Sequence, residues 1–405
     1  MKQYHYLIKH VLATGARKEN RTGVDTISTF GYYYEHDLRE GFPLLTTKKM
    51  PWRSIVIELL WFLSGTNRSG FLDRHGVTFW KPWYNPPGNP LDEVYGTPPD
   101  GVTVNAAYGP AWRRFEVPGH RESETGLGYS GPCTEWNDQI KWAVDKLKTK
   151  PMSRDIVVSA WQPHIAQKPP TANAYWAPCH CMFILNVQNE ELFEHAYSVF
   201  PSDDPHWERR LGYVMASTQE EADAKAREKF SGEEHVFASD TQSQFELAVA
   251  KSKRWNPPGS SDCWLEKPMV PDRYRQRLCL HLTQRSCDVL VGIPFNLASY
   301  ALLTHLMARF AGIEPGIFGH TLVDAHIYCA KPDGSQDEYD HIPGAKEQLS
   351  RTQRPLPKLI ISDDIKSLED VERLLHPSVT TDEIMSKFVL EGYDPHPAIP
   401  FKVAV

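Results

Sequence analysis

The sequence predicts an α+β fold, because helix and strand patterns follow one another without the regular alternation of an α/β protein. Apolar residues with the spacing of amphipathic helices occur at Tyr4, Leu7, Ile8, Val11 and Leu12 and at Ile140, Val144 and Leu147. β-Branched and aromatic residues dominate residues 26–38, which indicates strands. The chain contains no internal repeat.

The remaining elements are predicted by the same patterns. Apolar runs indicate strands at 156–161, 181–187 and 359–362, and alternating leucines indicate another strand at 278–282. Longer apolar stretches indicate buried helices at 54–63 and 296–310.

Residues 191–275 differ in character, because they are polar and interrupted by prolines. Ser217 and Glu220 fit a capping box before a helix at 221–230, and a second helix is expected at 241–253. Surface insertions add little loop-closure entropy. We therefore expect one domain built from 1–190 and 276–405, with 191–275 as an inserted subdomain of unknown role.

Composition narrows the class of protein. The chain has 405 residues, a net charge of −7 and 41% hydrophobic residues, so it can bury a large core. The chain has no block of lysine or arginine residues, so no DNA-binding surface is expected. The apolar stretch at 55–63 is too short to span a membrane. Seven scattered cysteines fit a reducing compartment, so a cytoplasmic protein is expected.

Cys179 lies at the start of a predicted strand, in the sequence Ala-Pro-Cys-His at 177–180. A cysteine thiolate is a strong nucleophile when nearby positive charge lowers its pKa. Taken alone, a buried unreactive cysteine explains the residue better. Cys179 and Cys181 have no second pair at zinc spacing, so no metal is expected.

Polar residues follow the strand at 278–282 and precede the helix at 296–310. Arg285 beside Ser286 suits a phosphate, although a surface ion pair explains the arginine equally well. Asn296 is most simply a helix N-cap. Its amide could also pair with N3–H and O4 of a uracil ring, since it offers both a donor and an acceptor.

Three further groups carry candidate chemistry. Glu58 lies within an apolar helix, where burial would raise its pKa and make it an acid or base near neutrality, unless it occupies a solvent edge. His326 and Tyr328 point to one face of a strand and suit a sugar hydroxyl. Aromatic side chains that could stack on a flat ligand, or simply pack in the core, are Trp80, Trp83 and Tyr108.

Together, and in this order, these motifs resemble the thymidylate synthase family. The matching segments are 21–23, 42–48, 58–63, 108–109, 112–113, 177–180, 284–288, 294–300, 324–328, 354–358, 391–397 and 404–405. The resemblance covers nearly all of the chain outside about 84–104, 191–275 and 329–345. It implies a large mixed twisted sheet covered by helices, with the inserted subdomain added.

The resemblance implies a reaction: reductive methylation of dUMP to dTMP. Its co-substrate would be 5,10-methylenetetrahydrofolate, which supplies both carbon and hydride and leaves as dihydrofolate without a metal. Cys179 would add to C6 of the pyrimidine. The other residues that the resemblance assigns to catalysis are Glu58, Tyr108 and His180.

It also implies two ligand sites and a homodimer with a large sheet-to-sheet interface. The dUMP residues would be Arg21, Arg154 from the partner subunit, Arg285, Ser286, Asp288, Asn296, His326 and Tyr328. The folate residues would be Lys48, Trp80, Trp83, Asp288, Gly292 and Phe295. The C-terminal tail would close over the ligands and exclude water.

The chain departs from the family pattern at several positions. Asp155 stands where a second arginine is usual, which removes a positive charge expected near the phosphate. Pro51 replaces a histidine that is common in the family, Val323 replaces a glycine and Lys402 replaces a proline. A side chain at Val323 would be expected to shift the local backbone.

Two alternative functions remain open at this point. A dUMP hydroxymethylase of the same superfamily would capture the methylene intermediate with water. A catalytically silent dimer would only bind ligands, with the insertion as its working part. Trp80, Tyr108 and His180 favour the methylating enzyme, and Asn296 favours uracil over cytosine.

Overall fold

A computed structural model describes residues 1–20, 23–84, 100–104, 108–117, 120–121, 129–130, 135–163, 177–191, 195–201, 211–216, 218–232, 236–240 and 274–403. The chain forms two compact units, which are described separately. Met1–Gln188 and Arg277–Val405 make the first unit, and Asn189–Gln276 make the second.

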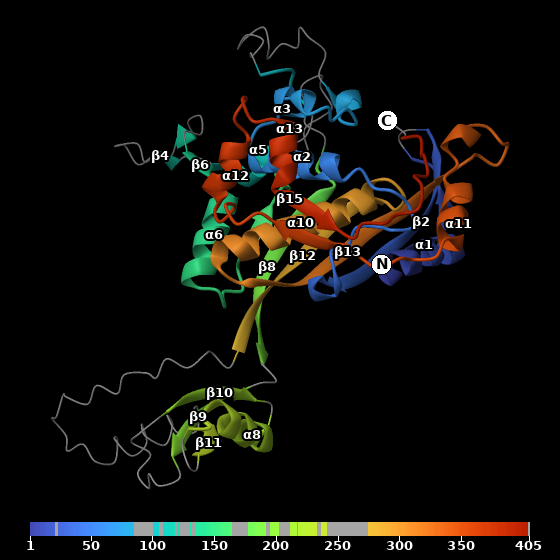
Figure 1. Ribbon diagram of the computed structural model, residues 1–405. Coiled ribbons are helices and arrows are strands. Elements are labelled where there is room, and N and C mark those ends of the chain that lie inside the picture. The colour runs from blue at the N-terminus through green and yellow to red at the C-terminus, as the bar shows by residue number, and fades with distance from the viewer. Residues whose placement is uncertain are drawn as a thin grey trace. The chain divides into compact units, whose positions relative to one another are not determined.

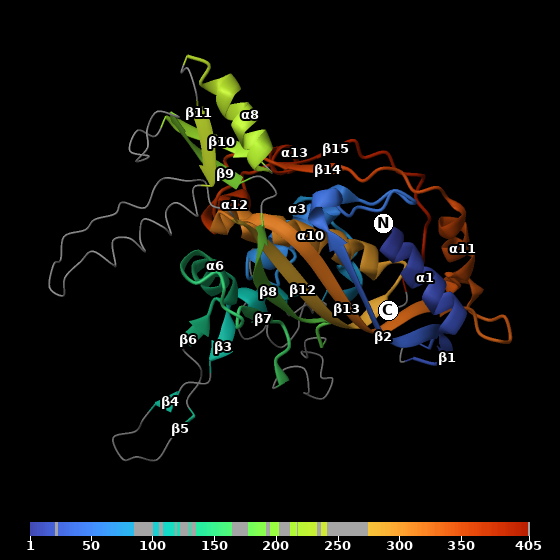
Figure 2. The ribbon, with the colours of Figure 1, turned by 90° about the horizontal axis from the view of Figure 1, so that it is seen from below.

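The first unit is built on a six-stranded sheet with the order β1-β2-β13-β12-β8-β7. Its strands are β1 (Ala16–Lys18), β2 (Asp25–Asp37), β13 (Glu314–Cys329), β12 (Tyr274–Asp288), β8 (His180–Glu191) and β7 (Val157–Ser159). The pair β12 and β13 is parallel, whereas β13 with β2, β1 with β2 and β7 with β8 are antiparallel. Figure 2 shows β8, β12, β13 and β2 side by side. The mixed sheet confirms the predicted α+β class.

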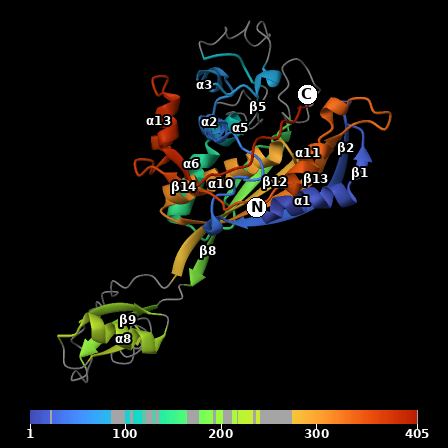
Figure 3. The ribbon, with the colours of Figure 1, turned by 45° about the vertical axis from the view of Figure 1, so that its right-hand side comes forward.

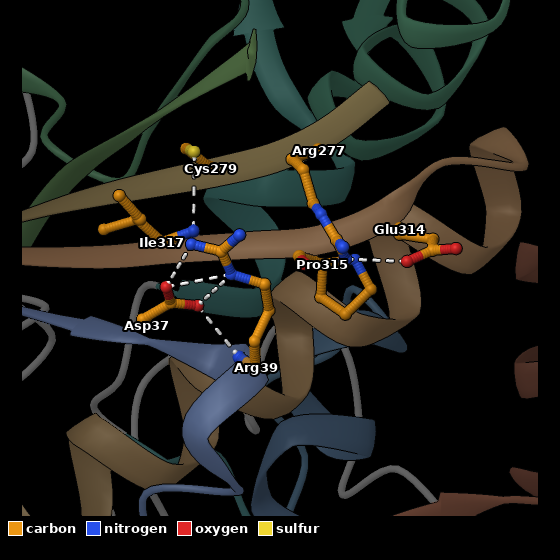
Figure 4. Close-up of polar contacts among 7 residues, drawn as sticks. All are labelled: Asp37, Arg39, Arg277, Cys279, Glu314, Pro315 and Ile317. Carbon is orange, nitrogen blue, oxygen red and sulfur yellow. Dashed lines mark hydrogen bonds and ion pairs between the residues drawn. The ribbon is translucent and has the colours of Figure 1, made fainter. Parts of the chain in front are cut away.

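The parallel pair of strands β12 and β13 is irregular near one end of the sheet. The register between β12 and β13 shifts between Leu278 and Leu280. At this point the Cys279 sulfur accepts a hydrogen bond from the Ile317 amide at 3.4 Å (Figure 4). Arg277 pairs with Glu314 at 2.6 Å beside it. The sulfur therefore accepts a backbone hydrogen at the point where the ladder between β12 and β13 shifts.

Strand β2 contains one left-handed residue, Gly31, with φ of 80°. It lies between Phe30 and Tyr32, which pair with Asp324 and Leu322 of β13. Val323 faces this glycine, and its own φ is not positive, since Gln336 is the one non-glycine residue with positive φ in the described ranges. The glycine carries the left-handed conformation at this point of the β2–β13 pair.

The helices of the first unit bury their apolar faces in one core with the sheet. The main ones are α1 (Lys2–Thr14), α2 (Trp52–Leu63), α5 (Tyr108–Arg113), α6 (Gln139–Thr149) and α10 (Gly292–Ala311). Helix α10 packs against β13, α2 and α6 (Figure 1), and α1 packs against β2 (Figure 3). The amphipathic patterns at residues 4–12 and 140–147 therefore predicted α1 and α6 correctly.

Shorter elements complete the first unit. These are η1 (Leu38–Glu40), α3 (Gly70–Arg74), η2 (Lys81–Trp83), β3 (Phe115–Val117), β4 (His120–Arg121), β5 (Tyr129–Ser130), β6 (Glu135–Asn137), η3 (Asp337–Tyr339), α11 (Ile342–Ser350), β14 (Lys358–Ile361), α12 (Leu368–Leu374), α13 (Thr381–Ser386) and β15 (Phe388–Glu391). Strands β14 and β15 form an antiparallel pair, as do β3 with β6 and β4 with β5. Capping boxes begin α12 and α13, at Ser367 and Thr380.

The second unit has its own small core. It consists of a sheet in the order β10-β9-β11 and one helix, with β9 (His195–Pro201), β10 (Gly212–Ala216), α8 (Gln219–Lys229) and β11 (Val236–Asp240). Both outer strands run antiparallel to β9. Its core includes Tyr197, Val199, Val214, Ala222 and Val236.

The cap of α8 differs from the sequence prediction. Thr218 is the N-cap, and its side chain accepts from the Glu221 amide at 3.2 Å. The predicted box at Ser217 and Glu220 was therefore displaced by one residue, because threonine and glutamate follow immediately and fit the same motif. Ser217 itself and the second helix expected at 241–253 lie outside the described residues.

Candidate active site

Cys179 is held at the start of β8 by two backbone hydrogen bonds. Its amide donates to the Tyr108 hydroxyl at 3.0 Å, and its carbonyl accepts from the Arg285 amide at 2.9 Å. The cysteine is partly exposed. A strand from one side and a helix from the other thus fix the backbone around a thiol that a ligand can reach.

The Arg285 side chain organises the segment in front of the cysteine. Its Nε donates to the Pro178 carbonyl at 3.0 Å, and its Nη2 donates to the Ala177 carbonyl at 2.6 Å. Its guanidinium carbon lies 5.8 Å from the centre of the Trp161 ring. These bonds leave other N–H groups of the guanidinium for an anion. Ser286, the next residue, is half-buried and pairs with Asp324 in the sheet.

Glu58 is buried, with 6% of its surface exposed, as its place in an apolar helix predicted. The Trp80 indole N–H donates to its Oε1 at 2.8 Å. Burial raises the pKa of Glu58 to about 7, and the bond from Trp80 opposes that shift. A carboxyl group with this pKa can give or take a proton near neutral pH.

Tyr108 and His180 form an aromatic pair beside Glu58. Their ring centres lie 4.7 Å apart, and the Tyr108 ring lies 6.5 Å from that of Trp80. Burial lowers the pKa of His180 to about 4, against a side-chain hydrogen bond with Asn296. The imidazole is therefore neutral, and its buried Nδ1 has no hydrogen-bond partner among the residues that the structure describes.

Asn296 lies inside helix α10, which corrects one reading of the sequence. The helix begins at Gly292, and its N-cap is Val291. Asn296 therefore does not cap the helix, and its side chain contacts Gln284 and His180. The Gln284 amide nitrogen donates to its Oδ1 at 3.1 Å. The helix was expected to start at 296 because asparagine is a common N-cap, although Pro294 is well suited to the first helical turn.

His326 and Tyr328 share one face of β13, as their spacing predicted. Their ring centres lie 5.5 Å apart and their planes are perpendicular. The His326 Nδ1 contacts the Asp324 carbonyl at 3.1 Å. Since a carbonyl only accepts, Nδ1 carries the hydrogen and Nε2 is left as an acceptor if the ring is neutral.

Two of the residues expected at a folate site, Asp288 and Lys48, contact the turn before α10. Asp288 accepts from the amides of Leu290 and Val291 at 3.0 and 3.1 Å. Lys48 donates to the Leu290 carbonyl at 2.5 Å. Burial lowers the pKa of Lys48 to about 8, opposed by the charge of Asp288.

The remaining residues of this group are aromatic or lack a side chain. Trp80 and Trp83 are half-buried, with ring centres 5.6 Å apart, and Phe295 lies 5.3 Å from Phe79. A Cβ on Gly292 would lie 3.6 Å from the Asn296 Oδ1. Glycine therefore leaves space beside that amide, and the tryptophans offer faces on which a flat ring can stack.

The C-terminal tail lies against the same region. Phe401 has Lys48 Nζ 4.8 Å from its ring centre, and His341 donates to the Lys402 carbonyl at 2.9 Å. The Lys402 ammonium reaches Glu338 at 3.3 Å. Lysine at this position thus anchors the tail through its backbone and an exposed ion pair.

Two arginines expected at the phosphate are not joined to this group. Arg21 lies outside the described residues. Arg154 is exposed in the turn between α6 and β7, and no contact with the other candidate residues is seen in the described part of the chain. Its neighbour Asp155 pairs with Lys146 at 2.5 Å, so a nearby cation offsets the added negative charge.

Sequence reasoning missed two polar residues connected to the site, Tyr34 and His320. Both are buried, and they are linked to Asn296 through Gln284. A signal existed, since His320 alternates with the buried Phe318 and Leu322 along β13. No group of three or more histidine, cysteine, aspartate or glutamate side chains placed for a metal occurs among the residues that the structure describes.

Comparisons with known proteins agree on one family. A family model described as thymidylate synthase matches residues 2–199 and 255–405. A thymidylate synthase of Listeria monocytogenes serotype 4a (strain HCC23) is 30% identical over 427 aligned positions, which span all of both chains. Within the described ranges, the helices are all too short or too polar to cross a bilayer.

Proposed function

The chain belongs to the thymidylate synthase family, and on that premise we propose that it converts dUMP to dTMP. The supporting observation is that Gln284 and Arg285, two adjacent residues of β12, hold Asn296 and Cys179. Arg285 bonds to the backbone of Cys179, and Gln284 bonds to the side chain of Asn296. A nucleophile, a cation and an amide able to read uracil are thereby held around one short stretch of strand.

In this proposal Cys179 attacks the pyrimidine. Its thiolate forms a bond to C6, and the electrons of the C5–C6 double bond move toward C5 and O4. Asn296 binds N3–H and O4, where the developing charge is stabilised by the amide donor. Glu58 and Tyr108 handle the proton that C5 loses, and neutral His180 holds Asn296 from the other side.

The phosphate and ribose are held by groups around this centre. Arg285 and Ser286 bind the phosphate with Arg21 and the partner subunit's Arg154, and His326 with Tyr328 binds the ribose hydroxyl. 5,10-Methylenetetrahydrofolate supplies the one-carbon unit and the hydride when it is bound. Residues of this chain that would hold it are Lys48, Trp80, Trp83, Asp288, Gly292 and Phe295. No metal ion takes part in the proposal.

We propose a homodimer formed through the sheet. Phe30 and Tyr33 of β2 are 88% and 51% exposed in the single chain, which is unusual for large apolar side chains. A second copy laid on this face would bury them. The reaction also suits the cytoplasm, because a thiol nucleophile works only while it stays reduced.

The decisive test identifies both the covalent bond and the product. Wild-type protein incubated with 5-fluoro-dUMP and methylenetetrahydrofolate should gain the mass of both ligands, and with dUMP it should release dTMP and dihydrofolate. Cys179→Ala should do neither, with a rate loss of at least about a thousandfold, while Cys181→Ser on the same strand keeps the activity.

Other products would point to other functions. Hydroxymethyl-dUMP with tetrahydrofolate would identify a hydroxymethylase in place of the synthase. A folded wild-type protein that binds dUMP without forming the covalent complex would identify a silent binding dimer.

A further inference from the structure

A chain of buried polar side chains runs from β2 across the sheet to the candidate active site. Tyr34 Oη lies 2.9 Å from His320 Nδ1, and His320 Nε2 lies 3.0 Å from Gln284 Oε1. Gln284 Nε2 lies 3.1 Å from Asn296 Oδ1. Exposure is 4% for Tyr34, 0% for His320 and 2% for Gln284, so water does not compete for these bonds.

The direction of each hydrogen bond follows from one carbonyl group. Gln284 also contacts the Ser286 carbonyl, at 3.0 Å. A carbonyl oxygen only accepts, so the Gln284 atom facing it must be the NH2 group. The same NH2 group faces Asn296, whose contacting atom must then be the oxygen. Asn296 is therefore oriented with its own NH2 group turned away from Gln284.

His320 completes the assignment. Gln284 presents its oxygen to His320 Nε2, which must donate. Burial lowers the pKa of His320 well below its ordinary value, so the ring is neutral and carries one N–H. Nδ1 is then an acceptor and takes the hydrogen of the Tyr34 hydroxyl. Each bond allows one direction only, and a reversed Asn296 amide would set two NH2 groups against each other.

The polarity of the Asn296 amide decides which pyrimidine fits. Uracil offers O4 as an acceptor, which matches the Asn296 NH2 group, and N3–H as a donor, which matches Oδ1. Cytosine presents the opposite pattern at the same edge, with an amino donor and a bare N3. It could pair only with a reversed amide, and sites that leave buried polar groups unpaired discriminate strongly.

We propose that His320, held by Tyr34, is a positioning residue that fixes the amide of Asn296 through Gln284 and thereby sets the preference for uracil over cytosine. The inference rests on the proposed function, because it assumes that Asn296 reads the pyrimidine. It assigns a role to two residues that touch no ligand and lie on strands β13 and β2, behind the site.

The test compares three exchanges. His320→Phe keeps a buried ring of similar size but gives Gln284 no donor, whereas His320→Gln retains a donor. His305→Phe is the control, because His305 is a half-buried histidine on α10 whose Nε2 makes no hydrogen bond within the described part of the chain. Binding of dUMP and dCMP is measured by calorimetry, and kcat and KM are measured for both, with thermal unfolding recorded for every variant.

We expect His320→Phe to lower the ratio of dUMP to dCMP affinity by about tenfold, mainly through weaker dUMP binding and a higher KM. His320→Gln should restore most of the ratio, and His305→Phe should leave it unchanged. A structural role alone would lower thermal stability in both phenylalanine variants without moving the ratio. A folded His320→Phe variant with the wild-type ratio overturns the proposal.

Two further outcomes are distinguished. Wild-type protein that binds no dUMP would contradict the proposed function, but not the positioning of Asn296 by His320 and Gln284. If His320→Phe fails to fold, Tyr34→Phe decides, since it removes only the hydroxyl that donates to His320 Nδ1 and holds the ring in place. A loss of about threefold in the ratio supports the proposal, and an unchanged ratio overturns it.

Discussion

Glu58 shows how a single residue in an unfavourable place acquires useful chemistry. It is buried within the apolar helix α2, and its one hydrogen bond in the described structure comes from Trp80. In the folded chain its pKa is raised by burial from 4.5 to about 7. The carboxyl group is therefore protonated in much of the pH range in which an unfolded chain would carry a charge.

This raised pKa predicts a pH-dependent stability. Below about pH 4.5 the carboxyl group is protonated in both states and contributes no pH dependence. As the pH rises, the unfolded chain ionises first, so the folded state loses stability until Glu58 ionises near pH 7. Relative to Glu58→Gln, the wild type should lose about 2–3 kcal/mol of unfolding free energy between about pH 5 and about pH 8.

Urea unfolding at fixed protein concentration measures this difference. Glu391→Gln is the control, since Glu391 is exposed at the end of β15 and should not change the pH dependence. Equal slopes for the wild type and Glu58→Gln would show that Glu58 ionises normally in the folded protein. Turnover by Glu58→Gln should fall by about a hundredfold or more, as expected for a lost proton-transfer group.

The site residues that sequence reasoning found are those with a local signal. Glu58 interrupts an apolar helix, Cys179 stands at a strand entrance, and His326 with Tyr328 alternates along a strand. The alternation along β13 marks His320 as buried but not as part of the site, and the role of Tyr34 and His320 depends on which strands are neighbours. The pairing of β2 with β13 was not available from spacing, so the buried chain could not be assembled.

At the scale of elements, β12 and the turn into α10 bring the site together. Asp288 ends the strand and accepts two amide hydrogens of the turn, and Lys48 binds a carbonyl of the same turn. Helix α10 has no side-chain cap of its own. The sequence predicted the strand and the helix, but the start of α10 was missed because a strong apolar pattern does not mark its own first residue.

Asp288 therefore has two separable roles, one in the turn and one toward folate. Asp288→Ala should lower the unfolding free energy by about 1–3 kcal/mol, since it leaves two amides of a buried turn unpaired. Asp288→Asn keeps a side-chain oxygen and should recover most of that stability. We expect Asp288→Asn still to raise the KM for methylenetetrahydrofolate, because it lacks the charge.

A second turn provides the control for the two Asp288 variants. Asp340 accepts from the Ile342 amide at 3.1 Å before α11, which is a similar arrangement with one amide hydrogen in place of two. Asp340→Ala should therefore cost stability without changing the KM for folate. A wild-type KM in Asp288→Asn would restrict Asp288 to its structural role.

At the scale of the whole molecule, the chain contains two separate cores. In the described residues, no member of the core around Val199 and Val214 belongs to the core of the first unit. The family model leaves residues 200–254 unmatched, within the polar segment that composition had marked. Polar composition and prolines marked the segment, but its sheet order depends on pairings between distant strands, which no local pattern encodes.

We propose that 1–190 and 276–405 form the catalytic domain and that 191–275 takes no part in the chemistry. A variant in which a short Gly-Ser linker replaces 191–275 should fold, form the 5-fluoro-dUMP complex and keep kcat within about threefold of the wild type. The physical reason is that excision removes one complete core and leaves the other intact, while a shorter connection between β8 and β12 lowers the entropy cost of pairing them.

Native mass spectrometry and covalent-complex yield measure the outcome, with Cys179→Ala in the shortened chain as the negative control. A shortened chain that is folded and dimeric but turns over more than about a hundredfold more slowly would show that the insertion acts in catalysis, since stability and assembly would then be unchanged.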